Sequence, residues 1–153
     1  MKKYKFNLVF LLIVISMSGC KENAVETSNE ILIYQLDGLI ENIGGDCSAV
    51  QVRTRTLGTF DLTNSNSIRF NFNGMSDADL SSIRIFYIND SDEQVNLVDL
   101  PDRDQINNTM NVTADSPGIN TEVYSRVTLR SSVCTGQIFN LTFRDLKIYS
   151  ITQ

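Results

Sequence analysis

The sequence predicts an all-β fold, an antiparallel two-sheet sandwich of about eight strands, and three observations lead to this prediction. Short runs of residues alternate between apolar and polar side chains, which is the period of a half-buried strand. Clusters of Gly, Asn, Asp and Ser separate these runs, as turns do between short strands. No window of eleven residues has the 3.6-residue period of an amphipathic helix.

The expected strands follow one another from residue 31 almost to the end of the chain. Their approximate ranges are 31–36, 49–56, 67–72, 83–88, 95–97, 110–112, 123–129 and 138–151. The last run changes phase, because its apolar side chains occupy odd positions up to Phe143 and even positions from Leu146. One extra residue near Arg144 and Asp145, in a bulge or a tight turn, would account for this change.

The first nineteen residues have the features of a signal peptide. Lys2, Lys3 and Lys5 form a basic start, and an apolar stretch of about twelve residues follows them. A membrane-spanning helix needs about twenty apolar residues, so this stretch is too short to cross a bilayer. We therefore expect residues 1–19 to be removed from the mature protein.

The end of this segment, Met17-Ser18-Gly19-Cys20, resembles the bacterial lipobox. The resemblance implies cleavage just before Cys20 and acylation of that residue, so that acyl chains such as palmitate hold the mature protein at a membrane. Lys21 stands where an Asp commonly retains lipoproteins at the inner membrane, so the same analogy favours the outer membrane and leaves the leaflet open. The alternative is a soluble secreted protein in which Cys20 has no role.

The mature chain divides into a polar tether, residues 20–30, and a sandwich domain, residues 31–153. The signal peptide removes three of the 13 basic residues and none of the 18 acidic ones, which leaves ten basic residues and a net charge of −8. An acidic chain without a basic cluster is a poor candidate for binding nucleic acid, which requires Lys and Arg against phosphates.

Residues 61–63, 68–74 and 83–87 resemble the middle strands of jelly-roll modules of the galactose-binding type, and residues 139–149 resemble their closing strand. The resemblance implies a two-sheet jelly roll in which the first and last strands are neighbours. Such modules often bind carbohydrate and sometimes hold a structural calcium ion. Their sugar contacts lie on variable loops, so no ligand residue can be transferred to this chain.

Two cysteines remain once Cys20 is set aside, namely Cys47 and Cys134. An even pair in an exported protein predicts a disulfide, because the compartment is oxidising. The bridge would close a loop of about 88 residues between the start of the second expected strand and the start of the last. The alternative is two separate thiols, and a catalytic Cys is disfavoured because the chain has no His to activate it.

Three Asp-x-Asp pairs recur in the chain, and the densest oxygen cluster is formed by Asp90, Asp92 and Glu93. Alternating acids in a loop are potential Ca²⁺ ligands, since this ion prefers six to eight oxygens. The alternative is that Asp is simply the residue that turns favour. Apart from this possible structural calcium, the sequence implies no cofactor.

Sugar binding usually requires an exposed aromatic ring, and Tyr87 and Tyr124 are the candidates for this role. Phe86 and Tyr87 are adjacent in a strand, so their side chains are expected on opposite faces of the sheet. The alternative for all of the aromatic residues is packing in the core.

These observations favour a lipid-anchored, non-enzymatic module of the cell envelope with a binding or structural role, and glycans are among its candidate ligands. One alternative is a small surface hydrolase or accessory enzyme that uses paired carboxylates, although no motif selects two of the 18 acids. Another is a structural subunit of an envelope complex that contacts protein through a sheet edge.

Overall fold

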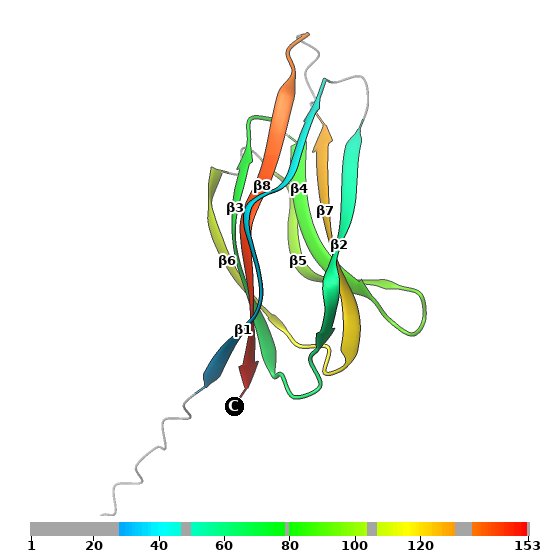
Figure 1. Cartoon of the computed structure of the whole chain (residues 1–153). Helices are drawn as coiled ribbons and strands as arrows, with labels where there is room; N and C mark the ends of the chain where they lie inside the picture. Colours follow the sequence, from blue (N-terminus) through cyan, green and yellow to red (C-terminus); the bar gives the residue numbers. More distant parts are fainter. Residues whose placement is uncertain (1–27, 47–49, 79, 104–106, 131–135, 153) are drawn as a thin grey trace, which may run out of the picture.

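The chain folds into two four-stranded antiparallel sheets packed face to face, and this computed structural model describes residues 28–46, 50–78, 80–103, 107–130 and 136–152. The predicted all-β sandwich of eight strands is confirmed (Figure 1). The strands are β1 (Asn29–Gly45), β2 (Gln51–Asp61), β3 (Ser67–Ser76), β4 (Leu80–Ile88), β5 (Gln94–Arg103), β6 (Asn107–Asp115), β7 (Asn120–Arg130) and β8 (Phe139–Thr152).

The strand order is that of a jelly roll. Sheet A has the order β1-β8-β3-β6, and sheet B has the order β2-β7-β4-β5. Only the β4–β5 connection stays within one sheet; the other connections cross from one sheet to the other. The first and last strands are neighbours in sheet A, so the long-range pairing that the resemblance implied is present.

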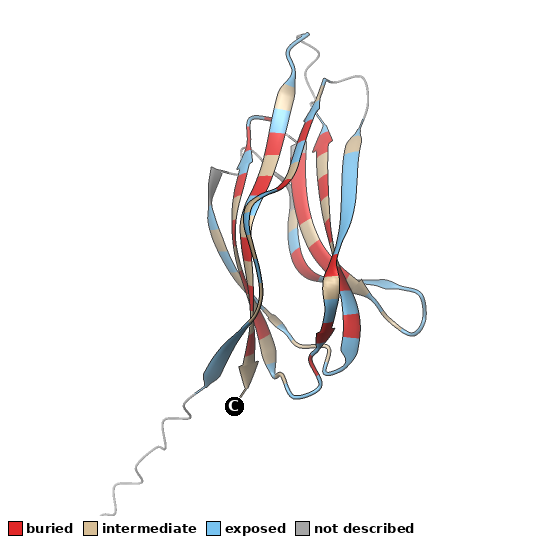
Figure 2. Ribbon diagram, in the orientation of Figure 1, coloured by how far each residue is buried: buried red, intermediate tan, exposed pale blue. Residues whose placement is uncertain are grey.

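One apolar core lies between the two sheets and takes one face of each sheet (Figure 2). Burial alternates strictly along β3 and β7, because successive side chains of a strand point to opposite faces. Phe72 and Phe143 meet edge to face at 5.2 Å between ring centroids. Each large apolar side chain that is fully buried in this way contributes about 1.5–3 kcal/mol to folding.

The phase change in the last strand is a β-bulge at Asp145, as the sequence predicts. Asn71 pairs with Lys147 whereas Asn73 pairs with Arg144, so β8 advances one residue more than β3 between the two pairs. Asp145 takes a left-handed conformation with φ of 57°. The bulge returns Leu146 to the core, where it is fully buried.

Burial along β2 does not follow the expected alternation, and the two valines of its expected range, Val50 and Val52, are half exposed at 50% and 46%. Val52 pairs with Thr128, which lies between two buried residues of β7 and therefore faces outward. A second bulge, at Leu57 between Thr56 and Gly58, then brings Leu57 and Phe60 into the core. The inward positions before the bulge include Arg55, whose Nε lies 2.9 Å from Glu41 Oε1 of β1.

The two ends of the sandwich are defined by the pairing of β1 with β8. Asn29 pairs with Thr152 at one end and Gly45 with Phe139 at the other, so the described chain begins and finishes at the same end (Figure 1). Strand β1 begins two residues before the expected domain boundary. Among the described residues no helix has the length and apolar character needed to cross a membrane.

Cys47 and Cys134 lie outside the described residues, so the disulfide stays a prediction. The described residues beside these segments are paired across the chain, Gly45 with Phe139 in sheet A and Gln51 with Leu129 in sheet B. The β1–β2 and β7–β8 connections therefore leave and rejoin the strands at one end of the sandwich.

We predict that the variant Cys47→Ala/Cys134→Ala folds to the same sandwich and melts about 10 °C lower or more. A bridge closing this loop restricts the unfolded chain and is worth on the order of 4 kcal/mol, a large share of a small domain's stability. Thermal unfolding followed by circular dichroism measures the difference. Reductant should lower the melting temperature of the wild type only, and two free thiols titrated in the non-reduced wild type would contradict the prediction.

Candidate functional site

Tyr87 and Tyr124 lie on opposite faces of sheet B. Tyr87 is on the inner face of β4, where it is partly buried and packs against the core. Tyr124 is on the outer face of β7, directly opposite Phe86 of β4. Phe86 and Tyr87 thus point to opposite faces, as adjacent strand residues must, and only Tyr124 of the two predicted binding residues belongs to an outer surface.

Phe86, Tyr124 and Arg126 form a layered cluster on this outer surface, which we call the aromatic platform. Phe86 is only 2% exposed although it faces away from the core. The Tyr124 ring stacks on it at 5.4 Å between centroids and 19° between planes. The Arg126 guanidinium carbon lies 4.7 Å from the centroid of the Phe86 ring. Tyr124 and Arg126 are therefore the outer layer, and Phe86 is the layer that supports them.

Hydrogen bonds hold both residues of the outer layer in place. The Tyr124 hydroxyl donates to Glu122 Oε2 at 2.5 Å, and this bond to a carboxylate raises the pKa of Tyr124, so the phenol stays protonated. Arg126 donates from Nε to Thr54 Oγ1 at 3.2 Å and from Nη1 to Gln94 Oε1 at 2.8 Å. The guanidinium thus forms hydrogen bonds with one residue of β2 and one of β5, the two edge strands of sheet B.

Planar polar side chains of β4 and β5 continue the platform on one side. Arg84 Nε donates to Asp99 Oδ1 at 2.9 Å, and the other carboxylate oxygen accepts from Asn96 Nδ2 at 3.0 Å. Asn96 Oδ1 accepts from Gln94 Nε2 at 2.6 Å. Guanidinium, carboxylate and amide groups therefore lie beside an aromatic ring on one open sheet face.

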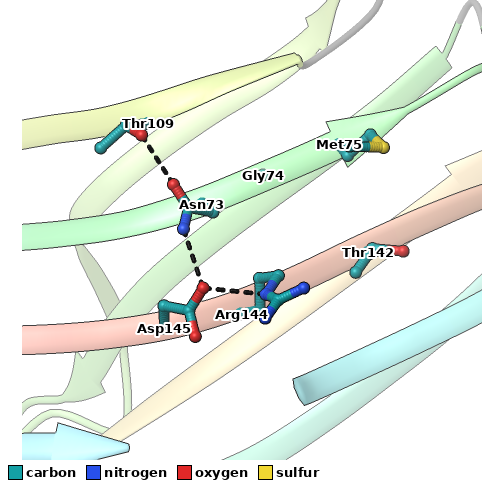
Figure 3. Close-up of a pocket in the computed structure, with 7 residues that line it drawn as sticks. All are labelled: Asn73, Gly74, Met75, Thr109, Thr142, Arg144 and Asp145. Atoms are coloured by element: carbon teal, nitrogen blue, oxygen red, sulfur yellow. Dashed lines mark hydrogen bonds and ion pairs between the residues drawn. The ribbon is translucent and has the colours of Figure 1, made fainter. Parts of the chain in front are cut away.

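A second feature is a groove of about 620 Å³ on the outer face of sheet A (Figure 3). Asp145 lines it and accepts three hydrogen bonds, from the Gly38 N–H at 2.8 Å, from Asn73 Nδ2 at 2.9 Å and from Arg144 Nε at 2.8 Å. Thr109 in turn donates to Asn73 Oδ1 at 2.7 Å. The described residues that line the groove are Asn73, Gly74, Met75, Thr109, Thr142, Arg144 and Asp145.

The hydrogen bonds of Asp145 have first of all a structural role. Gly38, with φ of +82°, lies at an irregularity of β1, and Asp145 is the bulged residue of β8. The bond between them joins the two irregular positions across the sheet. The amide of Asn73, the Gly38 N–H and Arg144 lower the pKa of the Asp145 carboxyl, because all three stabilise the charged form.

The described residues of this groove do not supply the two carboxyl groups that a glycosidase uses. Such an enzyme needs two carboxyl groups, one of them with a raised pKa so that it can donate a proton. Among the described lining residues Asp145 is the single carboxylate, and its pKa is lowered. The described lining of the groove therefore lacks the pair of acids that the hydrolase alternative requires.

The predicted calcium ligands Asp90, Asp92 and Glu93 lie in the hairpin loop between β4 and β5. Asn89 organises this loop, since its Oδ1 accepts the backbone N–H groups of Ser91 and Glu93 at 3.0 and 2.9 Å. The Glu93 carboxylate accepts from Asn89 Nδ2 at 3.1 Å. In the part of the chain that the structure describes, no three metal-ligating side chains converge. The contacts are those of an Asx turn, and the calcium site stays a prediction.

The sequence indicates Tyr87 and Tyr124 as binding residues and gives no role to Arg126 or to the partners of Asp145. The alternation of residues 83–88 placed Phe86 and Tyr87 on opposite faces, but it carried no sign of which ring lies inside. The phase change at Asp145 was visible, whereas its partners Asn73 and Gly38 lie 72 and 107 residues away. No protein-family model matches this chain, and no curated protein matches it either.

We predict that Asp145→Asn weakens the dependence of stability on acidic pH. The folded-state pKa of Asp145 is lowered, so its carboxylate stabilises the fold above the ordinary pKa of about 4, and this contribution is lost as pH falls through the lower folded value. The variant should melt below the wild type at pH 7 and lose less of its melting temperature between about pH 5 and pH 2.

A second variant separates this effect from general damage to the fold. Asn73→Ala removes the largest cause of the lowered pKa and should move the Asp145 titration upward in an NMR pH series. An unchanged titration in Asn73→Ala, or a wild-type pH slope in Asp145→Asn, would contradict the assignment.

Proposed function

We propose that the mature chain is a lipid-anchored, non-enzymatic protein of the cell envelope and that its sandwich binds a glycan at the aromatic platform. The observation that supports this proposal is Tyr124, a partly exposed ring stacked on Phe86 and bordered by planar polar side chains. The anchor would be Cys20, and Lys21 favours the outer membrane.

The properties of a sugar ring explain why this surface suits a glycan. A pyranose has an apolar C–H face and a polar edge of hydroxyl groups. The Tyr124 ring offers an apolar surface for the first, while Arg126, Gln94 and Asn96 offer donors and acceptors for the second. Because these side chains are already held by hydrogen bonds, little conformational entropy would be lost when a ligand binds.

The carboxylates of this surface support binding rather than hydrolysis. Asp99 is held by Arg84 and Asn96, and Glu122 accepts the Tyr124 hydroxyl. Each acid is thus engaged with a neighbouring side chain rather than directed at a common point, as the two acids of a glycosidase are. The structural-subunit alternative would instead use an open edge such as β6, and it predicts a dominant protein partner on cross-linking in intact cells.

We predict that Tyr124→Ala weakens glycan binding by about tenfold or more, the effect of losing roughly 1.4 kcal/mol of contact. The mature lipoprotein in detergent is applied to a glycan array, and the affinity of each bound glycan is then measured by calorimetry. Tyr149→Ala is the matched control, since Tyr149 is likewise a partly exposed tyrosine that packs against a neighbouring side chain, in its case Arg69, but on sheet A. Equal loss of affinity in both variants, or a glycan array without any bound glycan, would contradict the proposal.

The anchor is tested separately. Cys20→Ser should release the protein from the membrane fraction or leave the uncleaved precursor, because the acylated thiol is absent. Labelled palmitate should enter the wild type and not the variant, as followed by gel autoradiography. A wild-type protein that takes up no label would contradict lipidation while leaving the proposed glycan binding open to its own test.

A further inference from the structure

Arg84 and Arg126 lie side by side on the outer face of sheet B, and only Arg84 has a carboxylate partner within the described ranges. The register places Arg84 of β4 directly opposite Arg126 of β7, both on the outer face of sheet B. Like charges opposed across two strands destabilise a sheet. Arg84 is paired with Asp99, whereas Arg126 has no ion pair among the described residues.

The charge of Arg126 lies on sheet B, whose strands carry more basic than acidic residues although the protein as a whole is acidic. The strands of sheet B carry six arginines and four acidic residues, although the mature chain as a whole has a net charge of −8. The contacts of Arg126 are neutral: a threonine hydroxyl, a glutamine carbonyl and the Phe86 ring. An arginine held in this way keeps its charge and its orientation available to a ligand.

The donors of Arg126 fit a carboxylate. A guanidinium has five N–H groups, and Thr54 and Gln94 use two of them, so three are left for a ligand. A carboxylate is planar and accepts two parallel bonds from such a fork. Tyr124 and Arg126 are two residues apart on one face of β7, which separates them by roughly 7 Å along the strand. That spacing suits a sugar ring on Tyr124 with an exocyclic carboxylate at Arg126.

We infer that the platform recognises an acidic glycan, in which a uronic-acid ring lies against Tyr124 and its carboxylate pairs with Arg126. This inference rests on the proposed glycan binding and names its ligand class. Arg84 lies beside the same carboxylate, and its own pairing with Asp99 keeps its side chain in position. The carboxylate supplies the counter-ion that Arg126 lacks within the described part of the chain.

The test compares three polyuronates, polygalacturonate, polymannuronate and polyglucuronate, with the same polymers after reduction of their carboxyl groups. The mature lipoprotein in detergent should bind at least one polyuronate about tenfold more tightly than its reduced form, and added salt should diminish the difference. Arg126→Met keeps an unbranched side chain to cover Phe86 and removes the charged fork. It should lose this preference, so that its affinity falls further for the polyuronate than for the reduced polymer.

Arg69→Met is the matched control, because the Arg69 guanidinium also lies over an aromatic ring, with its carbon 4.4 Å from the Tyr149 centroid on sheet A. This control should retain the wild-type preference. Equal affinity for charged and reduced polymers, or an unchanged preference in Arg126→Met, would overturn the acidic ligand while leaving glycan binding standing. Failure to bind any glycan, charged or neutral, would overturn the proposed function and this inference together.

Discussion

Burial of one face of each sheet in a single shared core is the constraint on which the rest of the molecule depends. A strand has two faces, and packing the sheets against each other assigns one of them to the core. In β3 and β7 this assignment follows strict alternation, with Phe70 and Phe72 inside on one sheet and Val127 on the other. The residues between them are left to the outer surfaces, where any binding takes place.

The irregular positions of the strands keep this assignment intact. Without the bulge at Asp145, the second half of β8 would turn Leu146 and Ile148 toward solvent. The carboxylate of the bulged residue then holds Gly38 and Asn73 through hydrogen bonds. A feature that resembles a site in its shape is thus accounted for by the folding of sheet A.

The outer face of sheet B has a different origin. Phe86 is an aromatic residue in an outward position, where a bare ring would expose a large apolar area. Tyr124 and Arg126 cover it, so the residue is almost fully buried outside the core. The covering layer orients a phenol ring and a guanidinium toward solvent, and this arrangement is the basis of both proposals made for the platform.

The sequence by itself determined the all-β class, the number of strands and the place of the β8 bulge. These properties are local, because alternation and turn residues act over a few neighbouring positions. It also determined that Phe86 and Tyr87 face opposite ways. The signal segment and the two remaining cysteines are likewise sequence features, and their roles stay predictions.

Only the tertiary structure decided which face of each strand is inside and which strands are neighbours. Val50 and Val52 illustrate the first point, since the alternation of their run suits either face and the sheet turns Val52 outward. The pairing of Phe86 with Tyr124 illustrates the second, since 38 positions separate them in the chain. Register between distant strands is set by how the whole core packs, and no local pattern contains that information.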